Sequence, residues 1–219
     1  MMICPETFYE MKLKGKTTAE ITTVIRGLKQ EIGRLKNIVE HPEYKCTMCP
    51  SEDVRISCSR DYLERAKQAL VEAGGEYVPS AAEKKVMEFD ANIPNIRKVV
   101  FSIGGYSCGY ETRTYTVVGD TVRIDIEHSL DLKPSNLDEC EIEDMDKECF
   151  LETLKYLHIG EWRNHYNLKR YGYEILDGTQ WDLEIHFNNG KKTVKIYGDN
   201  AYPYNFNRAL ELFEVEGKY

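Results

Sequence analysis

The sequence lacks the long apolar run that a membrane protein needs. No stretch approaches the roughly 18 consecutive apolar residues that would span a bilayer. The N-terminal stretch MMICPETFYEMKLKGK also carries Glu6 and Glu10, whereas a secretory signal keeps an apolar segment there. These features argue against export and membrane insertion, and we therefore expect a cytoplasmic protein that has no membrane partner.

A cysteine pattern suited to disulfide bonds is missing as well. Seven cysteines, an odd number, are spread over 219 residues, and a chain of this length can build a core without covalent bridges. Because disulfides are rare in the reducing cytosol, we expect free thiols. The Gly-rich stretch GGYSCGY lacks the pattern of a phosphate-binding loop, and we expect no cofactor.

Basic residues are not in surplus. The net charge is −8, and it falls entirely on one part of the chain: residues 1–79 hold 12 basic and 12 acidic side chains, while residues 80–219 hold 17 and 25. Binding to a phosphate backbone needs a surface rich in Lys and Arg. We therefore expect no direct binding of nucleic acid.

What the sequence does contain is a globular composition, with 42% apolar and 30% charged residues. A helix of about residues 18–40 is predicted by the capping-box spacing Thr17-x-x-Glu20 and is ended by Pro42. Its apolar residues recur at heptad spacing at Ile21, Ile25, Leu28, Ile32, Leu35 and Val39.

A second helix follows Ser51 and stops at Gly74-Gly75. It repeats the same spacing at Ile56, Leu63, Ala66, Leu70 and Ala73. The two helices predict an antiparallel hairpin over residues 1–79. Two interpretations remain open: a hairpin packed on itself and on the rest of the protein, or an arm that docks a partner or forms a homodimer and an oligomeric scaffold.

Residues 80–219 read as an α+β domain: an antiparallel sheet of about five or six strands, packed by two or three helices on one face. Helices are expected from Ser80 to about Phe89, over Met145–Leu157 and from Pro203 to about Val215. The expected strands are Arg97–Ile103, a hairpin that turns at Gly119-Asp120, and a meander of Tyr171–Leu176, Trp181–Phe187 and Thr193–Tyr197.

The segment DGTQWDLEIHFNNGKKTVKIYGDNAYPYNF (Asp177–Phe206) resembles segments of uncharacterised bacterial proteins, many of them from anaerobes and their mobile elements. The stretches EIGRLKNIVEHPEY and MCPSEDVRISCSRDYLERA resemble the same group. This resemblance covers about half the chain. It implies a prokaryotic, mobile-element context and carries no activity or catalytic residue.

One candidate metal site lies at the tip of the predicted hairpin. Cys-x2-Cys is a zinc-knuckle spacing, and zinc takes four nitrogen and sulfur ligands. The candidate ligands are His41, Cys46, Cys49 and Cys58. The second pair is not a matching Cys-x2-Cys, and the alternative is a set of plain cysteines without metal.

A candidate catalytic face lies on the strand WDLEIHF, where Asp182, Glu184 and His186 alternate with Trp181 and the other apolar residues. Two acids and an imidazole on one face suit a divalent metal in a small hydrolase or nuclease. A half-exposed strand shows polar residues at every second position for purely structural reasons. The pattern fits both interpretations.

A third candidate is the acidic run from Asp138 to Glu152, which contains eight acidic residues and the single basic residue Lys147. Acids near a helix start interact favourably with its dipole, which accounts for part of the run. The other interpretation is a ridge that docks on a basic groove. The ridge comprises Asp138, Glu139, Glu141, Glu143, Asp144, Asp146 and Glu148.

Fifteen tyrosines favour a binding protein, because an amphipathic ring in a loop suits a contact surface. Four of them fall in expected loops: Tyr106, Tyr110, Tyr202 and Tyr204. The leading hypothesis from the sequence is a non-catalytic acidic module that binds a protein partner. In its most specific form, the hypothesis is that a phage or mobile element encodes this chain. The chain would then be an anti-CRISPR-like inhibitor of a nucleic-acid-binding defence effector.

Overall fold

The computed structural model describes residues 2–46, 48–106, 109–130, 145–175 and 177–215. The chain divides into two compact units, Met1–Ser80 and Ala81–Tyr219, which we call unit 1 and unit 2. The fold is α+β, as the sequence predicts, with helices that precede a mostly antiparallel sheet. Within the described ranges, no helix has both the length and the apolarity needed to cross a bilayer.

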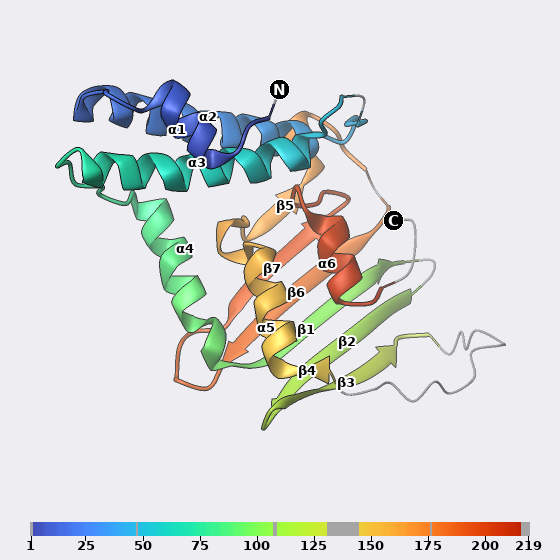
Figure 1. The fold of residues 1–219 in the computed structure, drawn as a ribbon. Helices are drawn as coiled ribbons and strands as arrows, with labels where there is room; N and C mark the ends of the chain where they lie inside the picture. Colours follow the sequence, from blue (N-terminus) through green and yellow to red (C-terminus); the bar gives the residue numbers. More distant parts are fainter. Residues whose placement is uncertain (1, 47, 107–108, 131–144, 176, 216–219) are drawn as a thin grey trace. The chain divides into compact units, whose positions relative to one another are not determined.

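Unit 1 is built on the two predicted long helices and a short helix that the sequence analysis missed (Figure 1). The Thr17 side chain accepts from the Glu20 backbone N–H while the Glu20 carboxylate accepts from the Thr17 N–H at 2.9 Å, so the predicted capping box is confirmed. The helices are α1 (Pro5–Lys12), α2 (Thr18–Val39) and α3 (Glu52–Glu72).

The heptad seam is buried between α2 and α3 inside the chain. Three predicted seam residues differ: Leu28 and Val39 are only partly buried, and Ala73, which follows α3, is exposed. A homodimer through the hairpin stays a prediction, and it would have to use residues other than this seam. The buried seam residues are Ile21, Ile25, Ile32 and Leu35 in α2, and Ile56, Leu63, Ala66 and Leu70 in α3.

Helix α1 is held against α3 by aromatic and polar contacts. The Tyr62 hydroxyl donates to the Ile3 carbonyl at 2.6 Å, and the Phe8 and Tyr62 rings stack with centroids 4.4 Å apart. The Arg65 guanidinium lies 3.8 Å from the centre of the Tyr9 ring. No residue of α1 is buried, which is why apolar periodicity does not reveal it.

Unit 2 contains one seven-stranded sheet in the order β4-β3-β2-β1-β6-β7-β5. All neighbours are antiparallel except β5 and β7. The strands are β1 (Ile96–Gly105), β2 (Gly109–Val118), β3 (Thr121–His128), β4 (Met145–Asp146), β5 (His165–Asn167), β6 (Gln180–Phe187) and β7 (Val194–Asp199). The helices are α4 (Ala81–Asn92), α5 (Lys147–Tyr156) and α6 (Phe206–Leu212), with 3-10 turns η1 (Ile93–Asn95), η2 (Ile159–Glu161) and η3 (Leu168–Tyr171).

One expected strand of unit 2 and the expected start of its last helix are wrong. The predicted strand Tyr171–Leu176 does not form: Tyr171 ends η3, and Gly172 follows at φ 81°, a left-handed conformation that turns the chain. The short strand β5, just upstream, pairs with β7 instead. The last helix begins at Phe206 rather than at Pro203, whose carbonyl accepts from the Phe206 N–H in the preceding turn.

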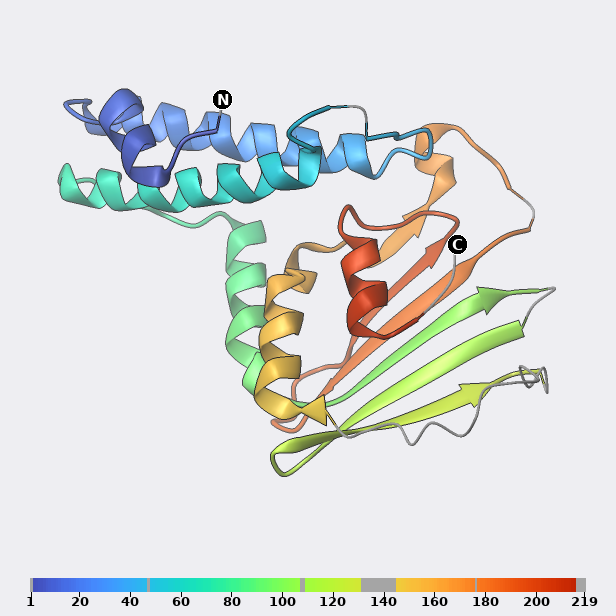
Figure 2. The ribbon, with the colours of Figure 1, turned by 45° about the vertical axis from the view of Figure 1, so that its right-hand side comes forward.

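Helices α5 and α6 cover one face of the sheet (Figures 1 and 2), and large aromatic side chains fill the space between the layers. Tyr115 of β2 stacks on Phe150 of α5 with ring centres 5.3 Å apart, and Phe101 of β1 stacks on Phe213 at 4.6 Å. The buried Trp181 indole donates to the Ala201 carbonyl at 2.9 Å. Such contacts combine apolar burial with satisfied polar groups.

The Tyr115 hydroxyl gives a stability prediction for unit 2. It is buried and donates to the Phe213 carbonyl at 2.8 Å. Tyr115→Phe leaves that carbonyl without its donor, so we expect the free energy of unfolding to fall by about 1–3 kcal/mol. Urea denaturation measures this loss. The control is Tyr156→Phe, which removes a hydroxyl from a tyrosine that is 74% exposed. Equal stability of the two variants would show that the hydrogen bond contributes nothing.

A second prediction concerns the tip of the hairpin in unit 1. The Tyr44 hydroxyl donates to the buried Glu52 carboxylate at 2.8 Å, and this bond lowers the pKa of Glu52. A lowered folded-state pKa stabilises the protein above the unfolded pKa, and the stabilisation is lost as pH falls through the folded value. We expect Tyr44→Phe to reduce stability at pH 7 and to lose this effect in acid, as followed by thermal unfolding between pH 7 and pH 3. A difference that does not change with pH would contradict this account.

Candidate functional site

The polar face of β6 carries the predicted hydrolase residues. Asp182, Glu184 and His186 point away from the core, while the alternate residues of the strand are buried. Glu184 forms a salt bridge with Lys195 of β7, and His186 Nε2 lies 3.2 Å from the Glu184 carboxylate. These contacts make the predicted face a row of paired charges on the sheet.

The electrostatics of this row follow from its contacts. The hydrogen bond from Lys195 is the main cause that lowers the pKa of Glu184, and the Lys195 charge adds to it. Partial desolvation, and then the charge of Glu184, raise the pKa of Asp182. On the other side, His186 Nδ1 lies 3.2 Å from the Thr193 hydroxyl. The row therefore holds an ionised Glu184 carboxylate whose charge Lys195 compensates.

The four candidate zinc ligands lie around the tip of the hairpin. His41, Cys46 and Cys49 fall in the loop between α2 and α3, and the His41 Nδ1 accepts from the Glu43 N–H at 3.2 Å. Cys58 lies within α3, where burial raises the pKa of its thiol. Among the described residues, no group of three or more His, Cys, Asp or Glu side chains is arranged to hold a metal ion. Neither the described part of the hairpin tip nor the β6 face holds such a group.

Most of the predicted acidic ridge lies outside the described residues. Asp138, Glu139, Glu141, Glu143 and Asp144 belong to that part of the chain. The two remaining members are described, and both line one hollow of unit 2, with a volume of about 650 Å³. We call this hollow the acidic groove. It is lined by Asp90, Ile93, Pro94, Asp120, Asp146, Lys147, Glu148, Leu151, Glu152 and Lys155.

Local hydrogen bonds bring the parts of the acidic groove together. The Lys147 backbone N–H donates to the Asp120 carbonyl at 3.1 Å, which fixes the start of α5 to the turn between β2 and β3. The Asp146 side chain caps α5 by accepting from the Cys149 N–H at 2.8 Å. Asp120 and Asp146 therefore lie on neighbouring strand ends, although the printed sequence separates them widely.

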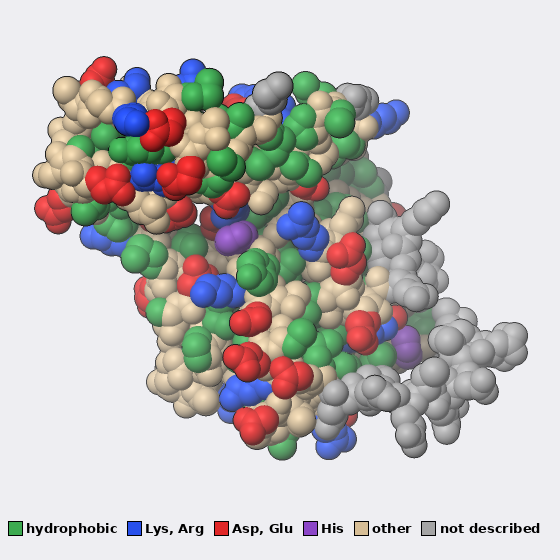
Figure 3. All heavy atoms as spheres, in the orientation of Figure 1, with side chains coloured by type: hydrophobic (Ala, Val, Ile, Leu, Met, Phe, Trp, Pro, Cys, Tyr) green, Lys and Arg blue, Asp and Glu red, His purple; other side chains and the backbone are tan. Residues whose placement is uncertain are grey.

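The charged rim of the acidic groove is unbalanced. Five carboxylates face two lysines, and within the described part of the chain neither Lys147 nor Lys155 forms a salt bridge with Glu148 or Glu152. Figure 3 shows acidic side chains gathered over the face that carries α5, with fewer basic ones among them. The sequence predicts Asp146 and Glu148 here, whereas Asp90 and Asp120 come from other elements and leave no sequence signal.

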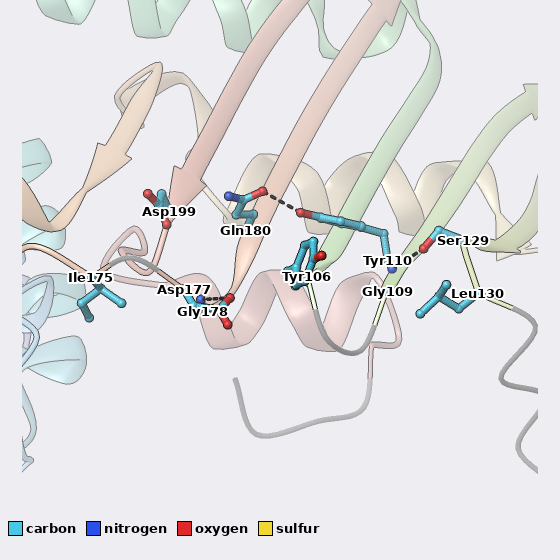
Figure 4. Close-up of a pocket in the computed structure, with 11 residues that line it drawn as sticks. Tyr106, Gly109, Tyr110, Ser129, Leu130, Ile175, Asp177, Gly178, Gln180 and Asp199 are labelled. Carbon is cyan, nitrogen blue, oxygen red and sulfur yellow. Dashed lines mark hydrogen bonds between the residues drawn. The ribbon is translucent and has the colours of Figure 1, made fainter.

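A second hollow lies where several strands end, and we call it the tyrosine groove (Figure 4). Its volume is about 550 Å³, and among the described residues that line it the charged ones are Asp177 and Asp199. Of the four tyrosines predicted to lie in loops, two line this groove: Tyr106 is 92% exposed, whereas Tyr110 lies in strand β2 and not in a loop. The lining residues are Gly105, Tyr106, Gly109, Tyr110, Ser129, Leu130, Ile175, Asp177, Gly178, Gln180 and Asp199.

The polar face of β6 gives a prediction on its charge pairing. Lys195→Met removes the main cause of the low pKa of Glu184, so we expect this pKa to rise towards the ordinary glutamate value near 4.3. An NMR titration of the Glu184 side-chain carboxyl measures the change. As a control, Lys192→Met removes an exposed lysine that lies just before β7, and it should leave the pKa of Glu184 unchanged. An unchanged pKa in both variants would show that the ion pair does not form in solution.

Comparison with known proteins does not add a function to these sites. No protein-family model, no curated protein and no solved structure matches this chain. The two grooves and the polar face of β6 are therefore the features from which we infer function.

Proposed function

We propose that this chain is a protein-binding module that engages a basic partner through the acidic groove and acts by occupying the partner's surface rather than by catalysis. The observation that carries the proposal is the excess of carboxylates in a groove that is also lined by apolar residues. Opposite charge on a partner would be attracted at long range and oriented on approach. The net charge of −8, which falls on residues 80–219, adds to this attraction.

The shape of the acidic groove suits the side chains of lysine and arginine. Its apolar lining residues are Ile93, which is buried, the exposed Pro94, and Leu151, which is partly buried on α5. Lysine and arginine have apolar stems that would pack on these residues while the charged head reaches the carboxylates of the same lining. A neutral or acidic side chain would gain no attraction from these negative charges.

The class of partner follows from the same complementarity. Surfaces with closely spaced Lys and Arg are typical of proteins that bind a phosphate backbone. An acidic groove placed against such a surface would compete with the nucleic acid for it. In its most specific form the proposal is therefore an anti-CRISPR-like inhibitor of a nucleic-acid-binding defence effector, which agrees with the mobile-element resemblance of the sequence.

A pull-down with matched variants tests this proposal. The baits are the native chain, a groove variant and a control variant, used on nuclease-treated bacterial lysate with identification by mass spectrometry. The groove variant leaves Asp146 in place because it caps α5. Its substitutions are Asp120→Asn, Glu148→Gln and Glu152→Gln, and those of the control, at exposed sites elsewhere, are Glu76→Gln, Glu127→Gln and Glu211→Gln.

We expect the native and control baits to recover the same nucleic-acid-binding protein and the groove variant to recover at least tenfold less of it. Recovery should fall as salt rises from 50 to 300 mM, because exposed charge pairs are screened. The purified partner should also lose its nucleic acid when the native chain is added. Equal recovery by all three baits, or no partner of this class, would refute the proposal.

A further inference from the structure

A second binding site is formed at the opposite end of the β2–β3 hairpin. We infer that the tyrosine groove binds an extended segment of a partner protein, with a lysine or arginine side chain between Asp177 and Asp199. This inference does not depend on the acidic groove, because it rests on other residues and on another end of the sheet.

The groove is long enough for an extended chain. A neighbouring hollow of about 400 Å³ shares Ile175 and Asp199 with it and continues to Asn167 and Leu168 at the end of β5. Together the two hollows run across the ends of strands β3, β2, β1, β6, β7 and β5. Five interstrand spacings of about 4.8 Å give roughly 24 Å, the length of about seven extended residues.

The walls of the groove are preformed. The Tyr110 hydroxyl donates to the Gln180 side-chain oxygen at 2.6 Å, across Gly104 of β1 (Figure 4). A Cβ on Gly104 would lie 2.0 Å from the Gly109 carbonyl oxygen, so glycine at this position lets the backbone of β2 approach β1 closely. The Tyr110 backbone is held as well, since its N–H donates to the Ser129 hydroxyl at 2.7 Å. A fixed wall lowers the entropy cost of binding.

The turn before β6 is fixed in the same way. Asn200 accepts from the Thr179 N–H at 2.9 Å, and a Cβ on Gly178 would lie 1.9 Å from the same Asn200 oxygen. One Asp177 oxygen accepts from the Gly178 N–H at 2.8 Å. Asp177 is therefore presented by a defined turn at the edge of the groove.

The chemistry of the larger hollow favours a cationic side chain. Its two charged lining residues are both acidic, and exposed apolar groups stand beside them: Tyr106, Leu130 at 44% and Ile175 at 51% exposure. An aromatic face next to carboxylates attracts a guanidinium or ammonium group and also packs against its stem. The smaller hollow is lined by Lys169, His165 and Glu174, which differ in charge. Charge therefore selects the side chain of the bound segment in the tyrosine groove and not in the smaller hollow.

Selection from a displayed library of linear seven-residue peptides tests this inference on the full chain. We expect enriched peptides to carry Arg or Lys at one fixed position. Replacing that residue by norleucine should weaken binding at least tenfold in fluorescence polarisation. Asp177→Asn with Asp199→Asn should cause a loss of the same size, because asparagine keeps the oxygen that accepts in the local turns. Tyr106→Ser, at an exposed residue, should also weaken binding.

The acidic-groove variant with Asp120→Asn, Glu148→Gln and Glu152→Gln serves as the control and should bind the enriched peptides as the native chain does. Near-ultraviolet circular dichroism confirms that each variant is folded. The inference would be overturned if the enriched peptides had no fixed basic position. It would also be overturned if they bound the Asp177→Asn/Asp199→Asn variant with native affinity. N-acetyl-arginine methylamide binding as tightly as a seven-residue peptide would also overturn it, since the site would then recognise a single cation and not an extended segment.

Discussion

The pairing of β1 with β6 is the interaction on which the rest of unit 2 depends. It joins the strands β1, β2 and β3, which come first in the sequence of this unit, to the later pair β6–β7. It also aligns Val99 with Ile185 in the centre of the sheet. The long segment between these strands must close before the pairing forms, which is an entropic cost that local hairpins do not have. The buried faces of both strands offset it, because Phe101, Ile103, Trp181 and Leu183 are fully enclosed.

The two grooves lie at opposite ends of the β2–β3 hairpin. The acidic groove lies at the turn of the β2–β3 hairpin, where Asp120 meets the start of α5. The tyrosine groove lies at the other end of the hairpin, where Tyr110 reaches Gln180 across β1. Since β2 has 10 residues, the two grooves are separated by roughly 30 Å along the strand direction. The sheet thus separates the two grooves by the length of a strand.

The sequence predicts the elements of this fold well where the signal is local. The capping box at Thr17, the heptad seam and the two-residue turn at Gly119-Asp120 each determine their own geometry through nearby residues. Prediction fails where the outcome depends on a distant partner. Strand β5 is only three residues long and forms because β7 lies beside it, whereas the alternating pattern after Tyr171 is broken by the left-handed Gly172.

The same distinction explains which site residues can be read from the sequence. Asp146 and Glu148 belong to a continuous acidic run, and the alternation of Asp182, Glu184 and His186 is visible in one strand. Asp120 and Asp90 join the acidic groove only through packing of the hairpin turn and α4 near α5. Asp177 and Asp199 face one hollow because β6 and β7 pair with Gln180 opposite Asp199. Chemistry that is assembled across strands leaves no pattern in the order of residues.

The two grooves would contribute differently to the binding of a single partner. Exposed carboxylates act over about one Debye length, so the acidic groove would increase the rate and the orientation of encounter more than the lifetime of the complex. The fixed walls of the tyrosine groove would act after encounter and slow dissociation. A partner that reaches across roughly 30 Å would meet the second groove at high effective concentration once the first is occupied. Selectivity would then come from the spacing of the two surfaces on the partner, because a basic protein without a matching extended segment would engage the acidic groove alone.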